Sequence, residues 1–222
     1  MDYNWLLAPS LLTLKVLAWA SILNLTLGLA LAFAIAYMRS RALKTVLETL
    51  VALPLIFPPM ATGFLLLYVL GRQGFLGRAL GEEWAFVFEF RGLVLAAFVS
   101  GLPLLVKPIQ SALESFPNGL VEAGQICAKS NLNIALFVIL PNIKNTLVAS
   151  FFIASARAVG EVGISLILGG NIIGKTDTIS LAIYNAVFDG ENEKALVLSL
   201  VLIVVSLFFF VLTRAFSRKR AV

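Results

Sequence analysis

Histidine is absent from this sequence of 222 residues, cysteine occurs once, and charged side chains make up only 13% of the total. The missing histidine removes a common ligand of zinc and haem sites. The single Cys127 excludes an internal disulfide and a cysteine metal cluster. The sequence therefore predicts a protein without a metal ion or another cofactor.

Apolar residues dominate the composition of the chain. They form 60% of the sequence, whereas soluble domains are about 45–50% apolar and about 25% charged. They also come in long runs without charge, at residues 16–38, 49–71 and 195–213. About 20 such residues cross the roughly 30 Å of hydrocarbon in a bilayer. We therefore predict an all-α, polytopic membrane protein with one transmembrane domain over residues 1–222.

Five membrane spans are expected from these runs and their edges, near residues 11–38, 47–71, 92–113, 136–160 and 195–214. Charge interrupts two of them, at Lys107 and at Lys144 with Arg157. Long basic side chains can extend to the headgroups, and Glu161, one turn after Arg157, can compensate its charge. Residues 178–188 are apolar on one face, and the sequence leaves open whether they form a short or a re-entrant sixth helix.

The basic residues predict the orientation, because loops rich in Lys and Arg stay in the cytoplasm. Arg39, Arg41 and Lys44 follow the first span, and residues 214–220 carry four more cations, whereas the charges in residues 160–193 are mostly acidic. We therefore expect the N-terminus outside and the C-terminus in the cytoplasm. The first span is expected to be retained, since neither a basic leader nor a small-residue cleavage site accompanies it. Nucleic-acid binding is not expected, because the cations form no patch interleaved with aromatics.

Residues 169–176 fit the pattern of a phosphate-binding loop, with Gly169, Gly174, Lys175 and Thr176 at the required spacing. That loop cradles phosphates only between a strand and a helix of an α/β domain. No such domain fits among the predicted spans. We therefore interpret residues 169–176 as a connecting loop on the outer side.

The segment between the third and fourth spans predicts a short helix at residues 119–130. Pro117 and Gly119 break the preceding helix, and Asn118 can cap the next one. From Leu120 onward, apolar residues recur on one helical face. Such a face rests either on the membrane surface or on a partner protein, and the pattern itself leaves that choice open.

This segment resembles the cytoplasmic loop of ABC importer permeases. The similarity is carried by the spacing of Glu122, Ala123, Gly124, Ala128, Leu140 and Pro141. Gly124 stands where the family usually has a second alanine, and Ala128 where it usually has glycine. Both changes keep a small residue, but alanine lacks the backbone freedom of glycine. The resemblance implies that the short helix docks into a groove on a separate ATPase subunit and transmits its closure to the membrane helices.

The resemblance covers nearly the whole chain and is sharpest to permeases for molybdate and related oxyanions. It is carried by residues 53–59, 62–63, 101–104, 156–163, 170–174 and 178–184. It implies a homodimeric channel in a prokaryotic inner membrane, with an ATPase dimer inside and a soluble binding protein that delivers the anion outside. Molybdate is the expected substrate, with tungstate and sulfate as alternatives because these anions share charge and tetrahedral shape.

Two sets of residues are candidates for the pathway or its gate. In a homodimer the route lies on the two-fold axis, where each residue is presented twice. The first set is a bend in the second span, because Pro54, Pro58 and Pro59 remove backbone donors. We hypothesise that this bend lines the route together with Thr62 and Gly63. A kink that serves only packing is the alternative.

The second set surrounds a charged pair, Arg157 and Glu161, with Gly160 and Gly163 beside the glutamate. Charges inside a membrane are costly, which favours a functional role. Because the pair is neutral overall, we expect a structural lock or a gate rather than an anion contact.

A different class of function, a self-contained channel or a proton-coupled carrier, needs a carboxylate near the midplane, and Glu161 is the candidate for it. An intramembrane enzyme would need paired acids, or a Ser or Cys next to a base. The sequence offers neither, so no catalytic residue is assigned. The expected protein is a transport permease whose ATP hydrolysis is supplied by a separate subunit.

Overall fold

The computed structural model describes residues 4–80, 86–127 and 129–217. These residues form helices and their connections, and no strand occurs among them, which confirms the all-α class. The elements in chain order are α1 (Asn4–Leu23), η1 (Asn24–Gly28), α2 (Leu29–Ala36), α3 (Arg41–Ile56), α4 (Pro59–Leu70), α5 (Phe75–Leu80), α6 (Phe90–Glu114), α7 (Asn118–Ile126), α8 (Asn131–Ile134), η2 (Ala135–Ile139), α9 (Leu140–Val159), α10 (Gly163–Gly169), α11 (Ile179–Phe188) and α12 (Asn192–Ser217). The two η elements are π-helical turns inside longer helices.

Four helical runs in the described part of the chain are long and apolar enough to cross a bilayer. They are Asn4–Ala36, Phe90–Glu114, Asn131–Val159 and Asn192–Phe216. Their positions agree with the first, third, fourth and fifth spans expected from the sequence. Apolar side chains are exposed along most of α12, as expected for a helix that faces lipid.

The second expected span, residues 47–71, is two helices rather than one. α3 ends at Ile56 and α4 begins at Pro59, and the backbone of Phe57 and Pro58 leaves the helical region. A proline disfavours helical conformation in the residue before it, and two prolines in succession give no hydrogen-bond donors. The two helices have 16 and 12 residues, and each falls short of the about 20 needed for a full crossing.

The segment expected at residues 178–188 is the helix α11. With 10 residues it is about 15 Å long at the usual rise of an α-helix, about half of what a crossing requires. Its first turn is fixed to α1, because the Ile179 N–H donates to Thr13 Oγ1 at 2.9 Å. The structure therefore describes this segment as a short helix that is packed against α1 and α12.

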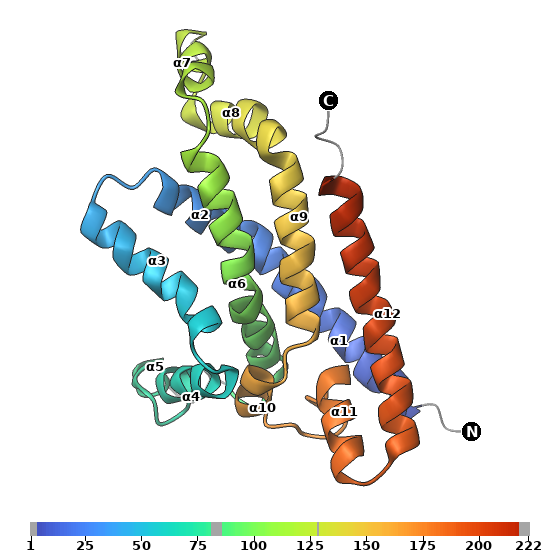
Figure 1. Cartoon of the computed structure of the whole chain (residues 1–222). Coiled ribbons are helices and arrows are strands. Elements are labelled where there is room, and N and C mark those ends of the chain that lie inside the picture. Colours follow the sequence, from blue (N-terminus) through green and yellow to red (C-terminus); the bar gives the residue numbers. More distant parts are fainter. Residues whose placement is uncertain (1–3, 81–85, 128, 218–222) are drawn as a thin grey trace.

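Helix α6 forms the centre of the bundle (Figure 1). It packs against α9, α1, α2, α3 and α10. Leu105, Val106 and Ile109 of α6 are completely buried. Helix α6 also lies close to the first span, because a Cβ built on Gly101 of α6 would be 3.3 Å from Asn24 Nδ2 in η1. Small residues at such crossings let membrane helices pack tightly where no hydrophobic effect drives them together.

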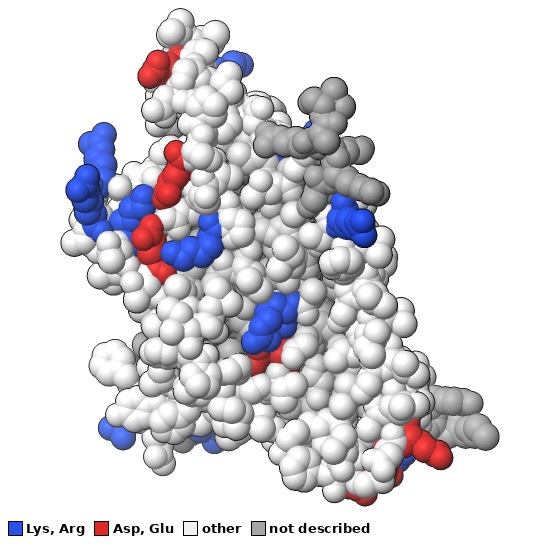
Figure 2. Space-filling view, viewed as in Figure 1, with Lys and Arg blue, Asp and Glu red and all other residues white. Residues whose placement is uncertain are grey.

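The two ends of the molecule carry different elements. Helix α7 and the last turns of α12 lie at one end, and the first turn of α1 lies at the other with α4, α5, α10 and α11 (Figure 1). In Figure 2, several Lys and Arg side chains gather over the α2–α3 connection, toward the α7 end. By the positive-inside rule we expect this end to face the cytoplasm. The orientation of the termini remains a prediction.

Candidate functional site

The junction between α9 and α10 contains the predicted charged pair. Glu161 is 2% exposed, and its Oε2 lies 2.6 Å from Arg157 Nη1. Its Oε1 accepts a hydrogen bond of 2.8 Å from the Ile164 N–H, in the first turn of α10. A carboxylate at this position stabilises the positive end of the helix. Glu161 therefore joins the end of α9 to the start of α10.

Arg157 is the more accessible partner, with 33% of its side chain exposed. In Figure 2 a blue and red pair lies in the middle of the visible face, over the α9–α10 junction, with uncharged atoms around it. A charge in such surroundings is costly unless it is compensated. The ion pair between Arg157 Nη1 and Glu161 supplies that compensation.

A cluster of buried polar groups that the sequence analysis missed surrounds Glu161. Thr13, Ser165 and Thr178 line a small cavity of about 10 Å³ beside the glutamate, a volume that suits about one water molecule. The Thr178 hydroxyl is buried without a hydrogen-bond partner among the described residues. Ser180 donates to the Val159 carbonyl at 2.8 Å. Hydroxyls inside otherwise apolar segments were the available signal, but their sequence positions do not show that they meet.

The second set of pathway candidates packs directly against this junction. A Cβ built on Gly163 would lie 2.7 Å from Pro59 Cβ. One built on Gly63 would lie 3.1 Å from the Ile164 Cα. A Cβ at Gly163 would require a shift and one at Gly63 would crowd Ile164, so the backbones of α4 and α10 are in close contact. The structure thus brings Pro59, Gly63 and Gly163 together next to Glu161.

Other candidates of this region have different surroundings. Thr62 is buried, and its hydroxyl donates to the Pro58 carbonyl of its own turn at 3.4 Å. Pro58 itself is exposed. Gly160 is exposed as well, and a Cβ there would have no atom closer than 3.9 Å. Pro54 lies inside α3 and does not end it. The bend is therefore set by Pro58 and its neighbours, and it packs on one side against α10.

Helix α7 is the structural counterpart of the predicted helix at residues 119–130. It ends at Ile126. The Ser130 hydroxyl caps the next helix, α8, by accepting from the Asn133 N–H at 3.3 Å. Glu122, Ala123 and Gly124 are therefore in α7. Ala128 lies outside the described residues.

The apolar face of α7 is unpartnered within the described chain. None of its residues is buried, and the side chain of Ile126 is 85% exposed. Contacts with the rest of the molecule run through Val121, which packs against the buried core, and through Gly124, where a Cβ would lie 3.0 Å from Cγ1 of the buried Ile134. Ile134 belongs to α8, which continues through η2 into Leu140 and Pro141 at the start of α9. This contact therefore links α7 to α9, the helix that carries Arg157 and ends at Val159.

The loop with the phosphate-binding pattern is closed by its own side chains. Thr176 is fully buried, and its hydroxyl donates to the Gly169 carbonyl at 2.7 Å and accepts from the Ile172 N–H at 2.8 Å. The Gly174 N–H donates to Asp177 Oδ1 at 2.9 Å. Burial raises the pKa of the Asp177 carboxyl. A helix precedes the loop instead of a strand, so it is a connection and not a phosphate cradle.

Comparison with known families gives a match over residues 7–222 to the family described as "Binding-protein-dependent transport system inner membrane component". The chain is 33% identical over 218 residues to the molybdenum transport system permease protein ModB of Escherichia coli K12, which covers 95% of this chain and 94% of that protein. It is 32% identical over 209 residues to the putative molybdenum transport system permease protein YvgM of Bacillus subtilis, covering 91% of each.

A relative named for a different anion is also similar. The sulfate transport system permease protein CysW of Synechococcus elongatus is 30% identical over 165 residues, which is 74% of this chain and 57% of that protein. These similarities confirm the resemblance that the sequence motifs carried.

Proposed function

Because the chain belongs to the family of inner membrane components of binding-protein-dependent transport systems, we propose that it is the permease subunit of an ATP-driven importer for a tetrahedral oxyanion. Molybdate is the proposed substrate, with tungstate and sulfate as alternatives, since relatives are named for molybdenum and for sulfate transport. Two copies form the pathway, a separate ATPase dimer hydrolyses ATP on the cytoplasmic side, and an extracytoplasmic binding protein delivers the anion.

The observation that carries the coupling to an ATPase is the exposed apolar face of α7. Leu120 and Ile126 are 46% and 85% exposed, at the end of the molecule where cations gather. Burying such a side chain contributes about 1.5–3 kcal/mol, so a protein groove that covers both stabilises a complex. Glu122 is also exposed on this helix and can form a polar contact at the rim of the groove.

The gate is proposed at the α9–α10 junction. Glu161 ties the start of α10 to Arg157, and α10 holds α4 through Gly63 and Gly163. A pull on α9 from the cytoplasmic end therefore reaches the bend at Pro58 through direct backbone contacts. This arrangement favours a lock between two conformations, which the ion pair stabilises in one of them.

The second copy is proposed to pack beside the same bend. Large apolar side chains are exposed there on both helices, at Ile56, Phe57, Met60 and Phe64. A two-fold axis near them would bring two bends and two charged pairs to one route. The exposed apolar face of α12 would then remain in lipid.

Transport by the reconstituted complex tests this proposal. Molybdate uptake into proteoliposomes is expected to require the chain, its ATPase, its binding protein and ATP. Scrambling residues 122–128 should abolish uptake while membrane insertion is retained. Anion flux from the pure chain, driven by an ion gradient alone, would instead establish the channel or proton-coupled carrier. That alternative needs an available carboxylate, whereas both oxygens of Glu161 are already in contact with other groups.

A further inference from the structure

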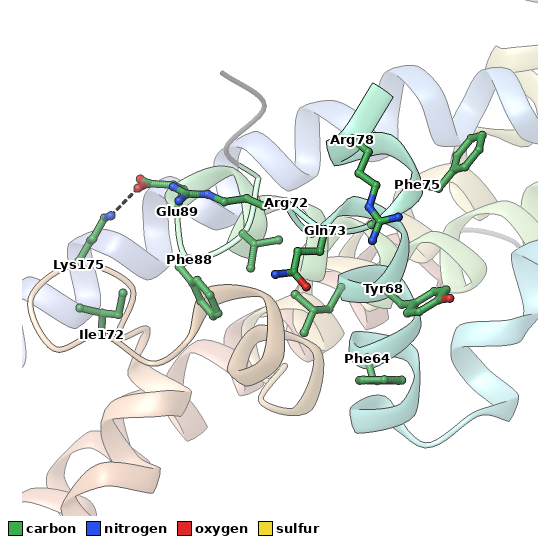
Figure 3. Close-up of a pocket in the computed structure, with 14 residues that line it drawn as sticks. Phe64, Tyr68, Arg72, Gln73, Phe75, Arg78, Phe88, Glu89, Ile172 and Lys175 are labelled. Carbon is green, nitrogen blue, oxygen red and sulfur yellow. Dashed lines mark hydrogen bonds and ion pairs between the residues drawn. The ribbon is translucent and has the colours of Figure 1, made fainter. Parts of the chain in front are cut away.

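Two hollows in the described part of the chain differ in their access to solvent. The larger, of about 1090 Å³, opens at the surface between α4, α5 and residues 172–175 (Figure 3). Its Lys175 and Glu89 form an ion pair and are 48% and 42% exposed, so surrounding water reaches their other polar atoms. The smaller hollow, of about 10 Å³, is lined by four polar residues that are each 6% exposed or less: Thr13, Glu161, Ser165 and Thr178. A partner for their side chains must therefore lie inside the protein.

The hydroxyl of Thr178 is the first unsatisfied group in this cavity. Thr178 is the residue before α11, where a hydroxyl usually caps the helix by accepting from a backbone N–H. It makes no such bond, and it has no other hydrogen-bond partner among the described residues. A buried hydroxyl without a partner is unfavourable. Its donor and its lone pairs are therefore available to a group inside the cavity.

One carboxylate oxygen of Glu161 is the second unsatisfied group. Oε1 accepts from the Ile164 N–H at 2.8 Å. Oε2 lies 2.6 Å from Arg157 Nη1, which compensates its charge, but the two atoms are not oriented as a hydrogen bond, and Oε2 has no hydrogen-bond partner among the described residues. The carboxylate is therefore neutralised by the arginine and still lacks one donor.

Volume and charge together identify the occupant. A hollow of about 10 Å³ suits about one water molecule, and it is too small for an oxyanion with four oxygens. A metal cation beside Arg157 would give the buried cluster a net positive charge, which surroundings of low polarity disfavour. A buried water needs two to four polar partners, and the walls supply them. The geometry points to one ordered water molecule in this cavity that accepts from the Thr178 hydroxyl and donates to Glu161 Oε2.

The second hydrogen of the water is directed to Thr13 or Ser165. The Thr13 hydroxyl donates to the Pro9 carbonyl at 2.8 Å and accepts from the Ile179 N–H at 2.9 Å. One lone pair of this oxygen remains for a further donor. Ser165 lines the same cavity from α10.

The water links Glu161 to helices that the charged pair does not touch. Thr178 lies at the start of α11, and Thr13 belongs to α1. Thr178 is therefore a positioning residue, which acts through the water on Glu161 and on its pair with Arg157. The water site follows from these contacts alone, whereas its effect on transport rests on the proposed function.

Thermal unfolding of Thr178→Val in detergent tests the site, because valine keeps the shape of the side chain and removes the hydroxyl. Loss of a hydroxyl without a partner would leave the melting temperature unchanged or raise it. Loss of one that is bonded to water should lower it by about 2–4 °C. Thr213→Val is the matched control, because the Thr213 hydroxyl bonds to the Phe209 carbonyl of its own helix at 2.9 Å. It should shift the melting temperature by no more than about 1 °C.

The positioning role is tested by the molybdate taken up per ATP hydrolysed, measured on the assembled complex in proteoliposomes. Unfolded protein loses both activities in proportion, so this ratio reports the position of Glu161 and not the stability of the fold. We expect Thr178→Val to lower the ratio about threefold, as for the loss of one hydrogen bond. Thr178→Ser keeps the hydroxyl and should keep the ratio of the wild type.

A structure of the wild-type transporter at a resolution that shows ordered water decides the site even where a variant fails to fold. Density between Thr178 and Glu161 would support it, and a direct hydrogen bond between their side chains would refute it. A melting temperature that rises with sodium or potassium in the wild type, but not in Thr178→Val, would replace the water with a cation. A lowered melting temperature with an unchanged uptake ratio in Thr178→Val would refute the positioning role alone. Absence of ATP-dependent uptake by the wild-type complex would refute the proposed function and leave the water site intact.

Discussion

Gly124 of α7 packs against Ile134 of α8 so closely that a Cβ on the glycine would lie 3.0 Å from Ile134 Cγ1. Ile134 is buried, so it has little room to yield. This contact links the exposed helix to the long helix α9 that carries Arg157.

The first prediction concerns the coupling of ATP hydrolysis to transport through α7. Gly124→Val should separate α7 from Ile134 and lower molybdate uptake more than tenfold, because the displaced helix no longer transmits motion. ATP hydrolysis by the assembled complex should persist. Gly119→Val is the control, since it makes the same substitution in the same helix and a Cβ at Gly119 meets nothing within 4 Å. Equal loss of uptake in both variants would show that the contact with Ile134 is unimportant.

The second prediction concerns the charged pair. Arg157→Gln leaves the buried Glu161 carboxylate without its cation. The cost should be below the about 3–5 kcal/mol typical of a fully buried pair, because Arg157 is 33% exposed. We expect loss of transport and a lower melting temperature in detergent. The charge reversal R157E/E161R should regain part of the transport, since the pair can reform. Full recovery is not expected, because arginine at position 161 cannot accept from the Ile164 N–H.

An anion contact at Arg157 would give a different result. The arginine variant alone would then raise the substrate concentration needed for half-maximal uptake, and the charge reversal would not restore it. That pattern, with unchanged thermal stability, would contradict the lock.

The third prediction concerns the contact between α4 and α10. Gly163→Ala places a methyl group 2.7 Å from the rigid Pro59 ring, and such overpacking typically costs about 1–3 kcal/mol. The melting temperature should fall, and uptake should fall with it. Gly160→Ala, three residues earlier, has open space around the new methyl group and should change neither. Thermal unfolding of both variants in the same detergent makes the comparison, and equal stability would exclude the tight contact.

The fourth prediction concerns the closed loop. Thr176→Val keeps the shape of the side chain but leaves the buried Gly169 carbonyl and Ile172 N–H without their partner, at about 1–3 kcal/mol for an unsatisfied group. We expect reduced thermal stability. Thr49→Val is the control, because the Thr49 hydroxyl is exposed and bonds only within its own helix. No variant of the loop should alter nucleotide binding by the complex, and an effect of Lys175→Met on it would contradict this interpretation.

The sequence predicts the parts of the fold that depend on local composition. Apolar run length locates four of the long helices, and the spacing of Arg157 and Glu161 predicts their ion pair. The prolines predict a bend in the second span, but a pattern of residue types does not show that Pro58 ends one helix and Pro59 starts another. The second span was therefore expected as one helix, which is wrong.

Contacts between distant segments could not be predicted. Gly63 and Gly163 are a hundred positions apart, and a glycine gives no local sign of which backbone approaches it. Glu161 accepts from the Ile164 N–H only because α10 begins at Gly163. The glycines at positions 160 and 163 hide that helix start in the sequence.

The break at Pro58 has a mechanical consequence. The hydrogen-bond ladder of α3 closes with the Phe57 N–H on the Leu53 carbonyl, and that of α4 opens with the Thr62 N–H on the Pro58 carbonyl. α3 rests on α6, whereas α4 rests on α10. The angle between α3 and α4 can therefore change by rotation of backbone bonds at Phe57 and Pro58, and every hydrogen bond within the two helices is preserved. A continuous helix would have to strain or break several of them to follow the same motion.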